Sequence, residues 1–243
     1  MQFDIITIFP EIFHSYFKES LLKRAQEKKL LRIGAHNLRD WASDAHKTAD
    51  DSPFGGGLGM VMKIEPIAKA VQSLKSEARN SKSLPGQQAG ETNTKYQILN
   101  TKTILFTPRG KKFTQKKAEE YAKLNQLIMI CGRYEGVDER VGKYIADEQI
   151  SIGDYDLMGG ELAAMIVVET VARLIPGVIG KEEFLEERRQ SDGGFVEYPQ
   201  YTRPEIFTDS TGKKRGVPKV LLSGNHKEIE AWRKKHGKVI RGR

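Results

Sequence analysis

Residues 127–175 read LIMICGRYEGVDERVGKYIADEQISIGDYDLMGGELAAMIVVETVARLI. Leu127–Cys131 is a short apolar run, which is typical of a buried strand. A short helix is predicted over Val137–Tyr144, a second strand over Asp147–Ile150 and a longer helix over Glu161–Ile175. Strands that alternate with helices in this way predict an α/β fold with a largely parallel sheet.

The same alternation extends toward the N-terminus. Further strands are predicted over Phe3–Phe9, Leu31–Leu38 and Thr103–Phe106, and further helices over Glu11–Lys28, Glu65–Ala78 and Thr114–Leu124. The turn-forming residues Thr107–Gly110 are expected to break the strand before them. Asp44–Lys63 has no regular period and is expected to be a long loop. Residues 76–96 turn polar and are expected to form a surface insertion.

Composition excludes several classes of protein. Forty Lys and Arg against 32 Asp and Glu give a formal net charge of +8, which suits a polyanionic partner. The single cysteine, Cys131, excludes an internal disulfide framework and a zinc knuckle. The longest apolar stretch, residues 162–175, is too short and too charged to span a membrane. The first residues lack the features of a signal peptide, so a cytoplasmic protein is expected.

Glycines gather at three later strand ends, whereas the common nucleotide motifs are absent. No P-loop pattern occurs, and the first strand is not followed by a glycine-rich turn. The glycine-bearing segments are TPRG (107–110), CGRYEG (131–136) and SIGDYDLMGG (151–160). Glycine permits close backbone approach, and parallel sheets bind ligands at the carboxyl ends of their strands. The pattern fits a pocket for adenine and ribose, or three tight turns without a ligand.

Six motifs carry a family resemblance. They are DIITIFPEIF (4–13), DDSPFGGGLGMVMK (50–63), CGRYEGVDERV (131–141), SIGDYDLMGGELAAM (151–165), VARLIPGVIG (171–180) and EYPQYTRPEIF (197–207). In these motifs the chain closely resembles the bacterial tRNA (guanine-N1)-methyltransferases, which modify the guanine immediately 3′ of the anticodon. The resemblance covers nearly the whole chain.

The resemblance implies a fold of the SPOUT superfamily, with a deep trefoil knot in the parallel-sheet domain. It implies a homodimer that binds S-adenosylmethionine in a bent conformation beside the subunit interface. The expected organisation is a knotted catalytic domain over residues 1–180, a linker over 181–197 and a small, mostly helical tRNA-binding domain over 198–243. No metal site is expected among the histidines, and the resemblance leaves a need for magnesium open.

The resemblance also implies a set of cofactor contacts on the three glycine-bearing segments. The implied residues are Thr107, Pro108, Gly132, Tyr134, Glu135, Ser151, Ile152, Gly153, Asp154, Tyr155, Asp156 and Leu157, with Gly159 and Gly160 shaping the pocket.

Methyl transfer to guanine N1 makes two demands on the protein. The N1 proton must be removed, which calls for a carboxylate as general base. Negative charge then spreads to O6, which calls for a cation or hydrogen-bond donors aimed at that atom. The resemblance assigns the second role to Arg173. Its structural alternative is an i,i+4 ion pair with Glu169.

The general base is expected in the segment after this helix. Counting without gaps from Arg173 places Arg188 at the family's acidic position, and arginine cannot act as a base near neutral pH. A shift of one residue supplies Glu187, which is the predicted base. Glu186 and Asp192 remain as alternatives.

Substrate contacts are expected at Asp50 and Lys63, which bracket the loop that contains Gly55, Gly56 and Gly57. A further substrate contact is expected at Arg203. The lysines of the C-terminal region suit phosphate contacts or form a solvated basic surface. The target guanine is expected to flip out of its stack. Two further functions stay open, a tRNA-binding module without catalysis and a methyltransferase acting on another RNA.

Overall fold

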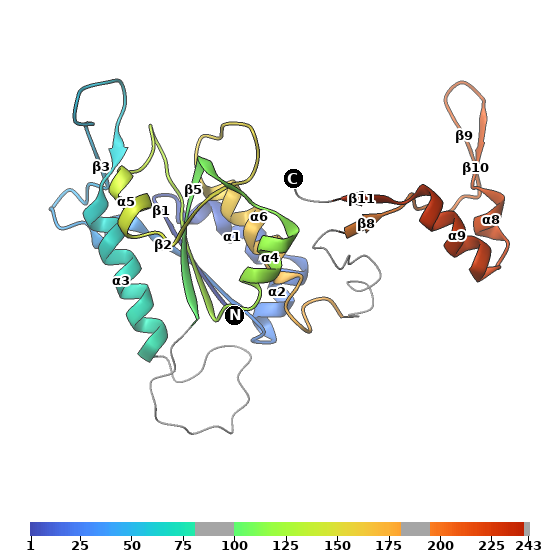
Figure 1. Ribbon diagram of the computed structural model, residues 1–243, viewed down its shortest axis with the longest axis horizontal. Coiled ribbons are helices and arrows are strands. Elements are labelled where there is room, and N and C mark those ends of the chain that lie inside the picture. Colours follow the sequence, from blue (N-terminus) through green and yellow to red (C-terminus); the bar gives the residue numbers. More distant parts are fainter. Residues whose placement is uncertain (81–99, 181–194, 241–243) are drawn as a thin grey trace. The chain divides into compact units, whose positions relative to one another are not determined.

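The computed structural model describes residues 1–80, 100–180 and 195–240. The chain forms two compact units, Met1–Glu182 and Glu183–Arg243 (Figure 1). The first unit contains the sheet and all of the glycine-bearing segments described above.

A five-stranded sheet of order β2-β1-β6-β5-β7 forms the centre of the first unit. Its strands are β1 (Gln2–Thr7), β2 (Arg32–Asn37), β5 (Thr101–Lys112), β6 (Gln126–Ile130) and β7 (Glu148–Ser151). Every neighbouring pair is parallel, so the predicted α/β class with a parallel sheet is confirmed. β1 and β6 are buried along their whole length, and the buried polar residues of β1 form hydrogen bonds, as between Gln2 and Asp4 and between Thr7 and Glu161.

Helices cover both faces of this sheet (Figure 1). One face packs against η1 (Pro10–Phe13), α1 (His14–Phe17), α2 (Ser20–Glu27), α4 (Gln115–Tyr121) and α6 (Glu161–Ala172). The other packs against η2 (Leu38–Trp41), α3 (Ile64–Asn80) and α5 (Glu139–Tyr144). One apolar core therefore lies on each face of the sheet, and together the two cores hold the strand ends in place.

The single helix predicted over Glu11–Lys28 is wrong in one respect. The segment is divided into η1, α1 and α2, and Ser20 adopts a left-handed backbone with φ +48° where α2 begins. Phe17 before the break and Leu22 after it are buried in the same core. Both pieces therefore bury apolar residues against the same face of the sheet, which is why the sequence pattern resembles one amphipathic helix.

The predicted end of a strand at Thr107–Gly110 is also wrong. β5 continues to Lys112, and its register with β7 shifts so that Phe106 and Lys111 both pair with Ile150. Pro108 within this bulge has no N–H to donate to the ladder, and proline in a sheet is confined to edges and bulges. The other predicted strands and helices lie within three residues of the observed ones.

The long loop predicted over Asp44–Lys63 contains a small hairpin of β3 (Asp50–Asp51) and β4 (Val61–Met62). The glycine loop, residues 52–60, connects these two strands. Of the predicted polar insertion, residues 76–80 belong to α3 and residues 81–96 lie outside the described residues.

The described part of the second unit combines helices with two antiparallel strand pairs. Its elements are β8 (Phe195–Glu197) paired with β11 (Lys238–Ile240), β9 (Ile206–Thr208) paired with β10 (Lys214–Gly216), α8 (Lys219–Leu222) and α9 (His226–His236). The expectation of a mostly helical domain did not include these strands. Three-residue strands carry too little pattern to be recognised in a sequence.

Candidate active site

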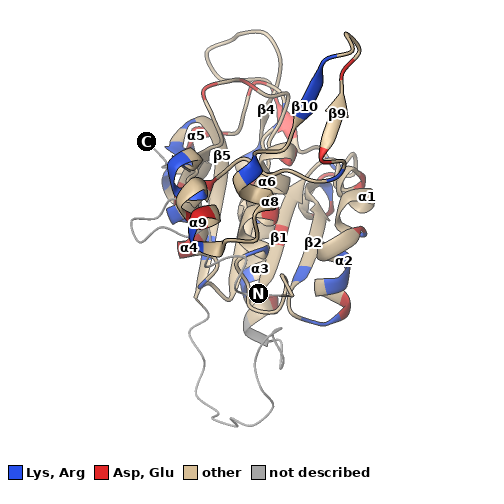
Figure 2. Cartoon of the chain, turned by 90° about the vertical axis from the view of Figure 1, so that its right-hand side faces the viewer, with Lys and Arg blue, Asp and Glu red and all other residues tan. Residues whose placement is uncertain are grey.

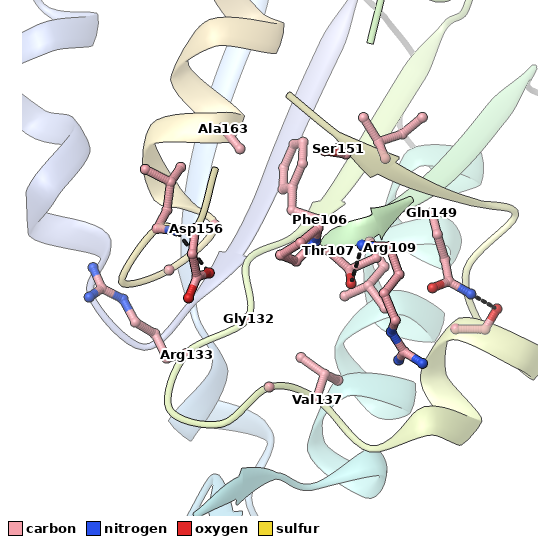
Figure 3. A pocket seen from close by; sticks show the side chains of 18 of the residues that line it. Phe106, Thr107, Arg109, Gly132, Arg133, Val137, Gln149, Ser151, Asp156 and Ala163 are labelled. Atoms are coloured by element: carbon pink, nitrogen blue, oxygen red, sulfur yellow. Dashed lines mark hydrogen bonds between the residues drawn. The ribbon is translucent and has the colours of Figure 1, made fainter. Parts of the chain in front are cut away.

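A pocket of about 400 Å³ opens at the carboxyl ends of β5, β6 and β7. Figure 3 shows Thr107, Gly132 and Ser151 around it. Thr107 lies at the bulge inside β5, Gly132 just beyond the end of β6 and Ser151 at the end of β7. The three glycine-bearing segments of the sequence therefore meet at one edge of the sheet, where open parallel sheets place their ligands.

The structure brings nearly all of the predicted cofactor residues together. The pocket is lined by Thr107, Pro108, Gly132, Tyr134, Glu135, Ser151, Ile152, Gly153, Tyr155, Asp156, Leu157, Gly159 and Gly160. Asp154 is the exception, because it does not line the pocket and its carboxylate pairs with Lys112.

Sequence reasoning missed several residues that line the same pocket. They include Phe106, Arg109, Val137, Gln149, Met158 and Ala163. Arg109 and Met158 lie inside segments already singled out, so position alone could have indicated them. Gln149 comes from β7 and donates from Nε2 to the carbonyl of Gly142 at 3.5 Å. No feature of the local sequence indicates that residue.

The bulge in β5 forms one wall of the pocket. A Cβ atom at Gly110 would lie 2.5 Å from the backbone nitrogen of Ile150. Only glycine allows β5 to approach β7 this closely after the register shift. The bulge turns Thr107 and Pro108 toward the pocket instead of leaving them in a regular ladder.

A buried ion pair anchors the second wall. Arg133 donates from Nε to Oε2 of Glu161 at 2.9 Å, and the Glu161 side chain is only 2% exposed. Thr7 donates from Oγ1 to the other carboxylate oxygen of Glu161 at 2.8 Å. The end of β1, the loop after β6 and the first turn of α6 are thereby joined at one carboxylate.

The start of α6 packs directly on the end of β6. Gly160 donates its N–H to the carbonyl of Gly132 at 3.0 Å. A Cβ atom at Gly160 would lie 2.7 Å from Cα of Cys131, and one at Gly159 would lie 2.3 Å from Nε of Arg133. Gly160 is required for this close approach, because backbone atoms cannot move aside, whereas a side chain at Gly159 would displace the Arg133 and Glu161 side chains.

The third wall is shaped by local hydrogen bonds. Ser151 donates from Oγ to the carbonyl of Gly153 at 2.9 Å, and Tyr155 donates from Oη to the carbonyl of Ile152 at 3.3 Å. Asp156 accepts from the N–H of Leu157 at 3.0 Å (Figure 3). These bonds hold the loop in a curved shape without a regular element.

The charged groups at the pocket are carboxylates and guanidiniums. Glu135 and Asp156 present exposed carboxylates at the pocket. The hydrogen bond from Arg109 at 2.6 Å lowers the pKa of Glu139. Burial, followed by the nearby carboxylate of Glu161, raises the pKa of the Cys131 thiol well above its usual range. That cysteine therefore stays protonated and does not act as a nucleophile.

Comparison with known proteins identifies the family. The family model described as tRNA (Guanine-1)-methyltransferase TrmD matches residues 1–241. A tRNA (guanine-N(1)-)-methyltransferase of Geobacter sp. (strain M21) is 48% identical over 235 residues, covering 97% of this chain and 84% of that protein. A protein of the same name from Dictyoglomus turgidum is 50% identical over 235 residues, with the same coverage of 97% and 84%.

The chain belongs to the tRNA (guanine-1)-methyltransferase family. A third relative, from Carboxydothermus hydrogenoformans, is 48% identical over 237 residues and covers 97% of this chain and 82% of that protein. The family and enzyme class predicted from the six motifs are therefore confirmed.

In this member of the methyltransferase family, Arg173 lies far from the pocket of its own chain. Gly160 is the N-cap of α6 and Arg173 is its C-cap, and thirteen residues of helix span about 20 Å. Arg173 is exposed and forms no ion pair with another described residue. Glu169 instead accepts a hydrogen bond from Tyr16 Oη at 2.7 Å. The alternative interpretation of Arg173 as the partner of Glu169 is therefore not supported.

The predicted substrate residues fall into two places. Asp50 lies in β3 and Lys63 follows β4, at the base of the glycine loop. Lys63 donates from Nζ to Thr48 Oγ1 at 3.2 Å and lies 4.0 Å from the carboxylate of Asp51. Arg203 is exposed in the second unit.

The candidates for the general base, Glu186, Glu187 and Asp192, lie outside the described residues, as does Arg188. Within residues 1–80, 100–180 and 195–240, no cluster of three or more His, Cys, Asp or Glu side chains is arranged to hold a metal ion. In the same ranges, no helix is both long and apolar enough to cross a membrane.

Proposed function

We propose that this protein transfers the methyl group of S-adenosylmethionine to N1 of the guanine immediately 3′ of the anticodon in tRNA. The observation that carries the proposal is the convergence of the three motif-bearing loops on one pocket of a chain that belongs to this family. A cytoplasmic location is part of the proposal, because tRNA is the substrate.

The pocket fits S-adenosylmethionine in size and in chemistry. Its volume of about 400 Å³ lies in the range of small-molecule sites. Gly159 and Gly160 leave no room for side chains where the loops approach one another, so main-chain groups face the pocket. The carboxylates of Glu135 and Asp156 suit the positive charges of the cofactor.

When bound, S-adenosylmethionine supplies an electrophilic methyl group. The chain's residues then orient the guanine and remove its N1 proton. We propose Glu187 as the general base that accepts this proton, with Glu186 and Asp192 as the alternatives. Arg173 is proposed to donate to O6, where negative charge accumulates as N1 loses its proton.

A second copy of the chain is proposed to complete this site. Leu162 and Ile166 are exposed on α6, 56% and 42% respectively, in the same stripe as Glu169 and Arg173. Exposed apolar side chains from η1 and the residues before it lie beside this helix, and Tyr16 is joined to Glu169. Large exposed apolar patches mark interaction surfaces. A homodimer packed on this face would bring Arg173 of one subunit toward the pocket of its partner.

The trefoil knot and the tRNA-binding role of the second unit also belong to the proposal. The hydrogen bond between Gly160 and Gly132 supports the knot, because it packs the loop after β7 against the loop after β6. The exposed lysines of β10 and α9 support the tRNA-binding role (Figure 2). Phosphate contacts from such residues position RNA without reading its sequence.

The test uses purified full-length protein, labelled S-adenosylmethionine and two tRNA transcripts that differ only at the base after the anticodon. Guanine in one and adenine in the other should give label in the first alone, recovered as 1-methylguanosine. Cofactor binding without transfer to either transcript would favour the tRNA-binding module, to which Arg188 at the expected acidic position points. Transfer to ribosomal RNA and not to tRNA would favour the alternative of a methyltransferase that acts on another RNA.

A panel of variants assigns the catalytic residues. Glu187→Gln should abolish transfer, whereas Glu186→Gln and Asp192→Asn should retain it. Arg173→Ala should lower kcat by about 10²- to 10³-fold, the usual cost of one oxyanion donor. Its cofactor affinity should not change, because Arg173 is proposed to contact O6 of the guanine and not the cofactor. Loss of transfer in Asp192→Asn and not in Glu187→Gln would move the base to Asp192.

A further inference from the structure

The glycine loop holds the most exposed large apolar side chain in the described part of the chain. Phe54 is 103% exposed, so it touches almost nothing else in the protein. Gly55, Gly56 and Gly57 follow it, all with positive φ. A Cβ atom at Gly55 or Gly56 would meet nothing within 4 Å. The phenyl ring therefore projects from an open, thin loop.

The base of this loop is bonded to the pocket. Glu135 donates its N–H to the carbonyl of Met60 at 3.0 Å, and Met62 donates its N–H to the carbonyl of Gly136 at 3.0 Å. The side chain of Glu135 lies against Gly59, where a Cβ atom would be 2.6 Å from Cγ of Glu135. The loop after β6, which lines the pocket, thus fixes the point from which the glycine loop rises.

Single exposed apolar side chains are common on protein surfaces, so the exposure of Phe54 points to a partner only because its loop is bonded to the loop that lines the pocket. Two occupants suit a ring on a loop that rises from the pocket wall, a nucleotide base and a second copy of the chain. A stable protein interface needs a broad, well-packed surface of about 1,000 Å² or more. The glycine loop offers only Phe54 and Leu58, separated by three glycines. A base needs only one aromatic plane.

We propose that Phe54 binds tRNA by stacking on an unpaired base that flanks the target guanine. Single-stranded RNA is commonly recognised by stacking its splayed bases on aromatic side chains. A guanine that enters the pocket leaves its neighbour without a stacking partner, and Phe54 replaces that partner. The inference rests on the proposed function, because it takes tRNA as the substrate.

The test compares Phe54→Ala, Phe54→Leu and Phe54→Trp with the wild type. Binding of an anticodon stem-loop RNA is measured by fluorescence anisotropy, alongside KM for tRNA, cofactor affinity and the mass of the dimer. Removal of a base–aromatic stack weakens binding roughly 5- to 150-fold. Phe54→Ala and Phe54→Leu should both show this loss, with cofactor affinity and dimer mass unchanged. Phe54→Trp should bind within about threefold of the wild type, because its ring still stacks.

Leu58→Ala is the matched control. Leu58 is 93% exposed on the same loop but has no aromatic face, so its truncation should leave RNA binding unchanged. Stem-loops that lack the base on the 5′ or the 3′ side of the target guanine complete a double-mutant cycle. The penalty of Phe54→Ala should vanish for one of these two RNAs.

Three results would overturn the stacking. One is wild-type RNA binding by Phe54→Ala, and another is an equal penalty on intact and both abasic RNAs. The third is wild-type RNA binding by Phe54→Leu together with dissociation of the Phe54→Ala dimer. That result would mean that Phe54 packs against the second copy of the chain and not on a base. Wild-type protein that binds RNA but methylates no tRNA would contradict the proposed function, and the binding measurements would still decide the role of Phe54.

Discussion

Glu161 buries its carboxylate against the guanidinium of Arg133, with 2.9 Å between Oε2 and Nε. Glu161 is the first residue of α6 and Arg133 lies in the loop after β6. The guanidinium also lies over the ring of Phe9, 4.9 Å from its centroid, and donates to the carbonyl of Met158 at 3.3 Å. One ion pair therefore fixes the mutual position of the loops that form the pocket.

Glu161→Gln should destabilise the protein and weaken cofactor binding together. Removing one partner of a buried ion pair costs about 3 kcal/mol, because the other charge stays buried without compensation. For a chain of this size that loss lowers the melting temperature by roughly 6–12 °C. Glu27→Gln at the exposed end of α2 is the control and should shift melting by little. Equal melting temperatures for both variants would contradict the structural role of the ion pair.

This ion pair could not be predicted from the sequence. Arg133 and Glu161 are 28 positions apart, and neither lies in a pattern that indicates burial of a charge. The helices were predictable because apolar residues recur with a period of 3.6, and the buried strands because they are short runs rich in apolar residues. The order β2-β1-β6-β5-β7 depends on long-range pairing, and no local pattern reports it.

The two local errors are opposite in kind. At Ser20 a new helix begins where one continuous helix was predicted, whereas at residues 107–110 the strand continues through a bulge where a break was predicted. Turn-forming residues have the same sequence signature whether a strand ends or only bulges. The location of the pocket was predictable because glycines marked all three strand ends, whereas Gln149 on β7 had no such mark.

Gly160→Ala should disrupt the pocket, although the substitution adds only one methyl group. The added methyl group would lie 2.7 Å from Cα of Cys131 and 3.2 Å from the backbone nitrogen of Gly132. Backbone atoms cannot rotate away, so α6 must shift, and overpacking of this kind costs about 1–3 kcal/mol. We expect cofactor affinity, measured by calorimetry, to fall at least about tenfold.

Gly180→Ala is the matched control for this substitution. No atom of the described residues lies within 4 Å of a Cβ atom at Gly180, so stability and cofactor affinity should stay at wild-type values. Wild-type cofactor affinity in Gly160→Ala would show that the close approach of α6 to β6 does not shape the binding site.

A second charged cluster should make stability depend on pH at both extremes. Glu148 accepts a hydrogen bond from Tyr121 Oη at 2.7 Å, pairs with Lys102 and lies 3.4 Å from Lys117. Burial opposes ionisation of Glu148, but the hydrogen bonds and charges of these partners prevail and lower its pKa. Burial, followed by the hydrogen bond to Glu148, raises the pKa of Tyr121.

The signs of the two effects differ. The Glu148 pKa is lower in the folded state, so its stabilisation is present above the unfolded pKa of about 4.3 and is lost as pH falls through the folded pKa. The Tyr121 pKa is higher in the folded state, so stability falls as pH rises above about 10. Urea denaturation across pH should show both losses, and Glu148→Gln should flatten the acid limb. An unchanged acid limb in Glu148→Gln would contradict the argument.

The hairpin of β9 and β10 should bind the phosphate backbone of tRNA. Lys213 and Lys214 are exposed and form no ion pair with other described residues, whereas Arg215 is paired with Asp209 at 2.9 Å. Unpaired lysines are free to displace the counterions of RNA. Each phosphate contact contributes roughly 0.7–0.9 to the slope of log affinity against log salt. The double variant Lys213→Ala/Lys214→Ala should therefore reduce that slope by up to about 1.8.

Net charge alone also changes RNA affinity, so the comparison needs a variant with the same loss of charge. Lys23→Ala/Lys28→Ala removes two exposed lysines from α2 and its C-cap in the first unit. If the hairpin touches phosphates, its variant should lose more of the salt slope than this control, with kcat unchanged and KM for tRNA raised. Equal slopes for the two variants would mean that the hairpin acts only through the general positive field of the protein.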